Sequence, residues 1–206
     1  MKRFLFWCNC LIAVLGPLPI LFAEETAPAA VYQKYVVAAD HRAASAAGLQ
    51  VLQRGGNVVD AAVATSFALS VVRPSSCGIG GGGFMVIWDA EQKSAVALDY
   101  RERAPLAAKR EMFMPADTGG GGLSSRWGGA AAAIPGTVAG LCHAHAHYGK
   151  LPLRDVLAPA IRLAEEGVPI DEHDIETQRE VLKQVAEIPS GRQRFAVLVD
   201  KYLNGG

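Results

Sequence analysis

Apolar and polar positions along the first part of the chain predict a strand followed by two helices. The short apolar run 35–39 is typical of a strand. Asp40 then caps a helix over 41–53, which ends at the glycine pair 55–56. Apolar side chains surround most of the circumference of the next helix, 58–72, so we expect that helix to be buried. Its many alanines would let another layer approach closely.

The rest of the chain predicts one hairpin and further helices. Residues 84–88 and 95–100 are two β runs joined by the polar turn 89–94. The Gly- and Ser-rich stretch 114–130 predicts a surface loop. Helices are expected over 107–113, 136–148, 153–166 and 171–186.

The stretch 77–88, CGIGGGGFMVIW, contains the spacing G-x-G-x-x-G. A dinucleotide site of this spacing needs a strand before the glycines and a helix after them, because the phosphate binds at the helix N-terminus. Here the glycines follow a helix and open a strand, so the dinucleotide interpretation fails. The alternative is steric: without Cβ atoms the loop can turn tightly and admit another backbone segment. The loop backbone could also form one wall of a site.

Composition narrows the class of protein. Half of the 206 residues are apolar and the formal net charge is zero, which excludes a disordered chain and a basic nucleic-acid binder. Lys2 and Arg3 precede the apolar run 4–23, and this order predicts a cleaved secretory signal over 1–23. We therefore expect an exported protein, periplasmic or secreted, with no stable membrane span once the signal is removed. An uncleaved signal anchor is the alternative.

The predicted domain organisation follows from the signal. Residues 24–34 are expected to form a flexible leader, and 35–206 a single domain. Two of the four cysteines lie in the signal, which leaves Cys77 and Cys142. An exported protein could join these two as a disulfide, but no Cys spacing supports a designed site, so two free thiols are expected.

Two clusters of titratable residues have a functional and a structural interpretation. His143 and His147 share a helix face at metal-ligand spacing, while His145 points elsewhere. With no third ligand nearby, we expect an exposed polar helix face and no metal. Four acids at the start of the last helix favour the positive end of the helix dipole, with a paired-carboxylate catalytic site as the alternative: Asp171, Glu172, Asp174 and Glu176.

Several motifs in register resemble the large-subunit region of γ-glutamyltransferases. They are GGNVVDAAVATSFALSVVRPSSCGIGGGGFMVIWD, ALDYRERAPLAAKREMF and IPGTVAGLCHAHAHYGKLPLRDVLAPAIRLAEEGVPI. The resemblance implies an α/β N-terminal nucleophile hydrolase fold, an αββα sandwich, present here in its helix-rich large-subunit portion. It also implies γ-glutamyl transfer or hydrolysis of glutathione and related compounds, without a metal or organic cofactor. In that family the precursor cuts itself, and the new N-terminal threonine of the small subunit attacks the γ-glutamyl carbonyl.

The resemblance assigns one substrate-binding residue. Arg101 matches the arginine that binds the α-carboxylate of the donor glutamate, and a guanidinium fork suits a carboxylate. Strand alternation puts Asp99, Arg101 and Arg103 on one face and Glu102 on the other. The alternative is a solvated ion pair of Arg101 with Asp99 or Glu102.

The nucleophile segment of the family is missing. The sequence contains no Thr-His pair, and Thr137 fits the first turn of a helix. We therefore expect a fragment truncated at its C-terminus, with no catalytic residue of its own, inactive without the small subunit, and poorly soluble because apolar faces and strand edges stay open. Two other functions stay open: a related acyl-amide or γ-polyglutamate hydrolase, and a non-enzymatic secreted remnant that binds small carboxylates.

Overall fold

The computed structural model describes residues 31–202, so the predicted signal over 1–23 and the first part of the predicted leader lie outside the described residues. The chain divides into two units, residues 1–35 and 36–206. The described part of the first unit, 31–35, contains neither helix nor strand. The remaining description concerns the second unit.

The second unit begins with two helices, α1 (Arg42–Gln53) and α2 (Val58–Val72). The prediction of a strand over 35–39 is wrong: the segment has no β-partner, and a strand is stable only when its backbone groups are paired. The predicted cap of α1 is also wrong. His41 caps it, because its Nδ1 accepts a hydrogen bond from the Ala43 N–H, whereas Asp40 lies 3.3 Å from the Arg73 guanidinium.

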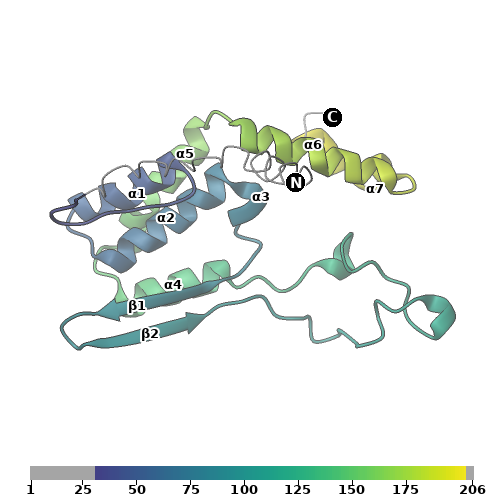
Figure 1. Ribbon diagram of the computed structural model, residues 1–206, viewed down its shortest axis with the longest axis horizontal. Coiled ribbons are helices and arrows are strands. Elements are labelled where there is room, and N and C mark those ends of the chain that lie inside the picture. Colours follow the sequence, from purple (N-terminus) through teal and green to yellow (C-terminus); the bar gives the residue numbers. More distant parts are fainter. Residues whose placement is uncertain (1–30, 203–206) are drawn as a thin grey trace, which may run out of the picture. The chain divides into compact units, whose positions relative to one another are not determined.

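Helix α2 is the central element of the helical layer, as its apolar circumference predicts. It contacts α1, α4 (Thr137–Tyr148) and α5 (Leu153–Glu166), and more than half of its residues are buried. A Cβ on Gly48 of α1 would overlap the Thr65 hydroxyl and would lie 3.1 Å from the Ala61 carbonyl oxygen. Small residues thus bring α1 and α2 together (Figure 1).

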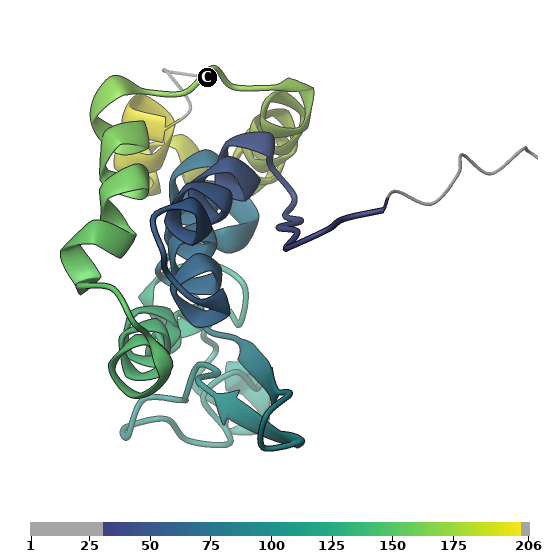
Figure 2. The ribbon, with the colours of Figure 1, turned by 90° about the vertical axis from the view of Figure 1, so that its left-hand side faces the viewer.

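The hairpin consists of β1 (Phe84–Asp89) and β2 (Ser94–Asp99), paired antiparallel from Phe84↔Asp99 to Asp89↔Ser94. These strands confirm the predicted hairpin to within one residue at each end. In both views the hairpin and α4 lie below α2 (Figures 1 and 2). The inner side chains of the hairpin pack against the core cluster that α2, α4 and α5 share: Met85, Ile87 and Leu98. The architecture is a layered α/β arrangement, with helices on one face of a two-stranded sheet.

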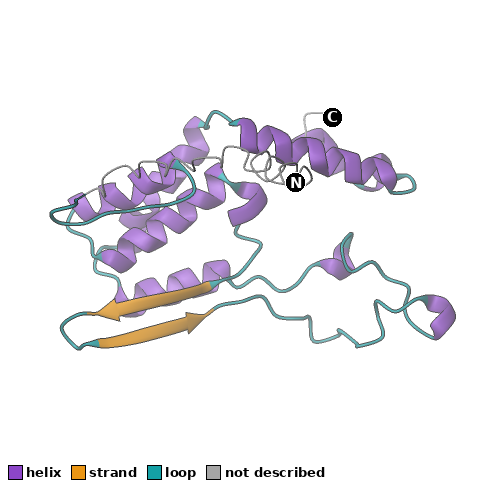
Figure 3. Cartoon of the chain, in the orientation of Figure 1, coloured by secondary structure: helices purple, strands orange, loops and turns teal. Residues whose placement is uncertain are grey.

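The other elements are short or peripheral (Figure 3). They are α3 (Pro74–Cys77), η1 (Ala116–Thr118), η2 (Gly129–Ala131), α6 (Glu172–Glu187), α7 (Gly191–Arg194) and the π-helical η3 (Leu198–Tyr202). The predicted helix over 107–113 is wrong. Isolated turns replace it, because nearly all of its side chains are exposed and so short a helix needs a packed face.

Two buried clusters form the core of the second unit. The first joins α1, α2, α4 and α5 through Val51, Val59, Val63, Ala64, Leu141, Ala144 and Val156. The second joins α1 to α2 and α5 through Ala44, Ala47, Ala68, Val72 and Ala160. None of the helices between residues 31 and 202 is both long and apolar enough to cross a bilayer.

Candidate substrate-carboxylate site

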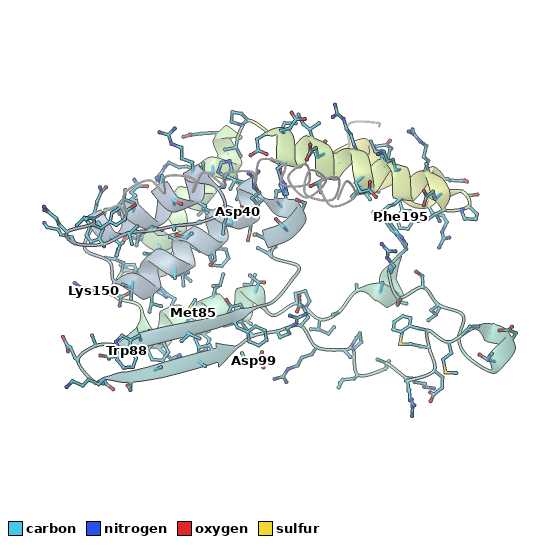
Figure 4. The ribbon with its side chains drawn as sticks, viewed as in Figure 1. Asp40, Met85, Trp88, Asp99, Lys150 and Phe195 are labelled. Atoms are coloured by element: carbon cyan, nitrogen blue, oxygen red, sulfur yellow. The ribbon has the colours of Figure 1, made fainter. Side chains whose placement is uncertain are left out.

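The extended segment from Tyr100 to Arg103 carries the predicted substrate-binding residue. It continues β2 beyond Asp99, which Figure 4 labels where the chain leaves the hairpin. Tyr100 exchanges two backbone hydrogen bonds with Gly83, at 3.0 and 3.4 Å. Arg103 exchanges two with Ile134, at 3.2 and 2.8 Å. Hydrogen bonds therefore hold the backbone of the segment on two sides. The glycine loop is the neighbour at Tyr100, and Ile134 is the neighbour at Arg103.

The glycine loop, residues 78–83, allows the segment 100–103 to lie directly against its backbone. A Cβ on Gly82 would lie 2.6 Å from the Tyr100 carbonyl oxygen and 2.7 Å from the Glu102 nitrogen. A Cβ on Gly83 would lie 2.9 Å from the Tyr100 ring. Since real Cβ atoms do not come within 3.0 Å of such atoms, the steric interpretation of these glycines is confirmed.

The start of α4 is tied to the same loop. The N–H groups of Gly136 and Thr137 both donate to the Gly81 carbonyl, at 2.9 and 3.0 Å. A Cβ on Gly136 would overlap the Tyr100 carbonyl, so α4 begins directly against the segment that carries Arg101. Thr137 is the first residue of α4, as predicted.

Side-chain alternation along this segment separates two pockets. The glycine pocket, about 500 Å³, is lined by the glycine loop, Glu102 and Thr137. The arginine pocket, about 350 Å³, is lined by Asp99, Arg101, Arg103, Ile134, Gly136 and His143. The predicted faces are therefore observed: Glu102 lines one pocket, and Arg101 and Arg103 line the other.

Arg101 is accessible within the arginine pocket. Its side chain is 66% exposed, and its guanidinium lies 6.0 Å from the centre of the Phe84 ring. Its backbone N–H donates to Asp99 Oδ1 at 3.0 Å. Its Nε lies 3.3 Å from Glu102 Oε2, so the ion pair foreseen as the alternative role is present as well. An exposed pair of this kind is weak, which leaves the guanidinium free to exchange Glu102 for another carboxylate.

The histidines of α4 divide between two environments. His143 and His147 are exposed with ring centres 4.0 Å apart, as the predicted polar face requires. His145 points elsewhere, as predicted: its Nε2 lies 2.8 Å from the Leu151 carbonyl oxygen and 3.7 Å from Asp60 Oδ1. Across residues 31–202, the structure contains no group of three side chains arranged to hold a metal ion.

The acids at the start of α6 have a structural partner. Asp171 caps the helix and Asp174 completes a capping box, and both carboxylates bind the guanidinium of Arg73, which is only 7% exposed. The hydrogen bond from Arg73 holds the pKa of Asp171 at about 2, below its ordinary 3.8. The hydrogen bond to Asp171 also raises the pKa of Arg73. These acids thus anchor an arginine at the end of α2, and the alternative of a paired-carboxylate catalytic site has no support from the geometry.

Asp60 is a second buried anchor that the sequence did not reveal. Its side chain is fully buried and accepts hydrogen bonds from the N–H groups of Asn57, Lys150 and Leu151, at 3.0 to 3.2 Å. The start of α2 is thereby joined to the turn between α4 and α5. Cys77 and Cys142 carry free thiols.

Comparison with known proteins identifies the family. The sequence pattern described as Gamma-glutamyltranspeptidase matches residues 44–205. The chain belongs to this family. It is 40% identical over 186 residues to the glutathione hydrolase proenzyme of Bacillus subtilis (strain 168), an alignment that covers 83% of this chain and 31% of that relative.

Solved structures of gamma-glutamyltranspeptidases resemble the fold of this chain. The gamma-glutamyltranspeptidase of Helicobacter pylori aligns with a TM-score of 0.72 and 40% identity over 82% of this chain and 48% of that one. The enzyme of Pseudomonas nitroreducens, complexed with L-DON, also aligns with a TM-score of 0.72, at 34% identity over 81% of this chain and 49% of that one. The α/β N-terminal nucleophile hydrolase class is therefore confirmed for the part of the fold described. This chain spans about a third of the length of the curated relative it matches.

Proposed function

We propose that this chain contributes the large-subunit share of an enzyme that transfers or hydrolyses γ-glutamyl groups, with glutathione and related compounds as donors. Arg101 binds the α-carboxylate of the donor glutamate. The observation that carries the proposal is the position of Arg101: accessible, lining a pocket, and held by a backbone that is hydrogen-bonded on both sides.

The chemistry of this step needs only the guanidinium and a substrate carboxylate. A planar fork of N–H donors binds a carboxylate through two parallel hydrogen bonds, which fixes the orientation of the donor as well as its position. The bound substrate replaces Glu102 as the ion-pair partner. The reacting hydroxyl belongs to the N-terminal threonine of the small subunit, with its own α-amine as the base, and no metal or organic cofactor takes part.

The hairpin supports the need for a complementary polypeptide. Phe84, Val86 and Trp88 project from the face opposite α4 and are 63%, 73% and 62% exposed. A sheet of two strands is marginal by itself, and covering the part of each side chain that is still exposed would stabilise an assembly by about 1–2 kcal/mol per side chain. We propose that the small subunit covers this face, and that residues 1–206 alone do not turn over substrate.

Export is part of the same proposal. Lys2, Arg3 and the apolar run 4–23 would direct the chain out of the cytoplasm, to the periplasm or the medium. Cell fractionation of the tagged chain tests this location. Recovery of uncut chain from the cytoplasm alone would contradict it.

The decisive experiment co-expresses the chain with the small-subunit polypeptide and follows release of a chromogenic amine from a γ-glutamyl anilide. We expect turnover by the assembly and none by the chain alone. Arg101→Gln should lower kcat/KM about 10- to 100-fold, since a charge-assisted hydrogen bond is lost. The control Arg110→Gln, at an exposed position outside the arginine pocket, should have no effect.

Two results would count against the proposal. The first is an Arg101→Gln enzyme as active as the parent. The second is equal cleavage of a simple acyl anilide without the α-carboxylate, which would favour the related acyl-amide hydrolase.

A further inference from the structure

Arg103 lies in the arginine pocket beside Arg101 but differs from it in its pairing. Both side chains project from the same face of the extended segment, two residues apart. Arg101 is paired with Glu102 at 3.3 Å. Among residues 31–202, no carboxylate lies within ion-pair distance of the Arg103 guanidinium. The second cation of the pocket is therefore available to a ligand.

The position of Arg103 is fixed by its backbone. Its N–H and carbonyl both bond to Ile134, the residue that leads into Pro135 and α4. The backbone bridge to Ile134 thus fixes the position from which the Arg103 side chain enters the lining of the pocket. The other charged or titratable groups that line the pocket are Asp99, Tyr100 and His143. Glu102 already pairs with Arg101, so Arg103 is the guanidinium of the lining that can take a ligand carboxylate without losing an ion pair.

The spacing of the two arginines suggests the ligand. Residues i and i+2 of an extended chain lie about 7 Å apart. In a γ-glutamyl dipeptide, the carboxylate of the γ-linked amino acid lies at a comparable distance from the α-carboxylate of the glutamate, with the scissile amide between them. A donor of this kind thus matches the spacing of the two backbone positions from which the guanidiniums extend.

We propose that Arg103 determines donor specificity: it binds the carboxylate of the γ-linked amino acid. Among the γ-glutamyl compounds of the proposed function, the pocket then prefers γ-glutamyl amino acids over donors in which this carboxyl is amidated, glutathione included. The inference rests on the proposed function, because it takes Arg101 to hold the α-carboxylate of the donor. It adds a second anchoring point on the leaving-group side of the scissile bond.

The test is a titration of the chain with two ligands that differ in one charge, γ-glutamylalanine and γ-glutamylalanine amide. Binding is followed by the NMR signals of the arginine Nε–H groups, which needs no turnover. We expect the parent chain to bind the dipeptide about fivefold more tightly than its amide, the size of effect that one exposed ion pair supports. Arg103→Gln should abolish the preference, Arg103→Lys should restore most of it, and Arg110→Gln should leave it unchanged.

The outcomes separate this inference from the proposed function. Equal affinity of the parent chain for the two ligands, or an unchanged preference in Arg103→Gln, overturns the role of Arg103. Arg101→Gln should weaken both ligands. Suppose that Arg101→Gln leaves the affinity for both ligands unchanged while Arg103→Gln still removes the preference. The α-carboxylate role of Arg101 is then wrong, and the contact between Arg103 and the ligand is still supported. Circular dichroism of each variant confirms that the comparison is made between folded chains.

Discussion

Replacing Gly82 by alanine tests whether the glycine loop exists to admit the segment that carries Arg101. The new Cβ would lie 2.6 Å from the Tyr100 oxygen, 2.7 Å from the Glu102 nitrogen and 2.9 Å from the Arg101 carbonyl carbon. All three atoms belong to the backbone, so no flexible side chain can move aside. To restore an ordinary contact of 3.4 Å, the loop and the segment must separate by about 0.8 Å.

This separation should lower both the free energy of unfolding and the affinity of the arginine pocket for a ligand. Forcing an extra carbon into a close-packed position costs about 1–3 kcal/mol. For a chain of this length, each kcal/mol lowers Tm by about 2–4 °C, so we expect a fall of roughly 2–12 °C. The displaced segment carries Arg101, so affinity for a γ-glutamyl ligand should fall as well.

The same loop contains a matched control. A Cβ on Gly80 would have nothing within 4 Å, and neither Gly80 nor Gly82 has a positive φ, so alanine is free of backbone strain at both positions. Urea unfolding at 25 °C, followed by circular dichroism, should give Gly80→Ala a stability within about 0.5 kcal/mol of the parent. If Gly82→Ala unfolds at the same urea concentration as Gly80→Ala, the steric account of the loop is wrong.

Substitutions at three further positions probe the anchors of α2 and the open face of the hairpin. Asp60→Ala removes the fully buried acceptor of three backbone N–H groups and should cost about 3 kcal/mol in urea unfolding, with a smaller loss for Asp60→Asn. Because the folded-state pKa of Asp171 is depressed, its stabilising contribution is present above pH about 4 and is lost as the pH falls towards 2. Arg73→Met should therefore lower the unfolding midpoint at pH 7 and flatten the dependence on pH in that acid window. A dependence as steep as that of the parent would contradict the pairing. Trp88→Thr should change stability by less than about 0.5 kcal/mol but weaken co-elution with the small subunit in size-exclusion chromatography.

The elements that could be predicted from the sequence are those with local signals at both ends. Helix α2 runs from Val58 to Val72 as predicted, because Asn57 caps its start and Pro74 prevents its continuation. Helix α5 was also predicted with its observed bounds. The strand over 35–39 and the helix over 107–113 had the right composition but lack a partner to pack against, and composition carries no information about partners.

The buried charges escaped prediction for a related reason. Arg73 binds acids 98 and 101 residues further along the chain, and Asp60 binds N–H groups 90 and 91 residues away. A charged residue at a helix end is usually solvated, so nothing local distinguished these two. Arg101 was found because several motifs in register resemble a known family. By strand alternation alone, it was equivalent to Arg103.

The contacts of Asp60 and Arg73 with distant parts of the chain position the helix that leads into the glycine loop. Asp60 holds the start of α2 to the turn between α4 and α5, and Arg73 holds its end to the start of α6. The chain then passes through the single turn of α3 into the glycine loop, so we expect the contact of Gly82 with Tyr100 to depend on how α2 is held. The segment that meets the loop carries Arg101 and Arg103. A substitution at either anchor should thus weaken γ-glutamyl binding without touching the arginine pocket, and it should do so in proportion to the stability it removes, whereas Arg101→Gln should weaken binding in a chain of unchanged stability.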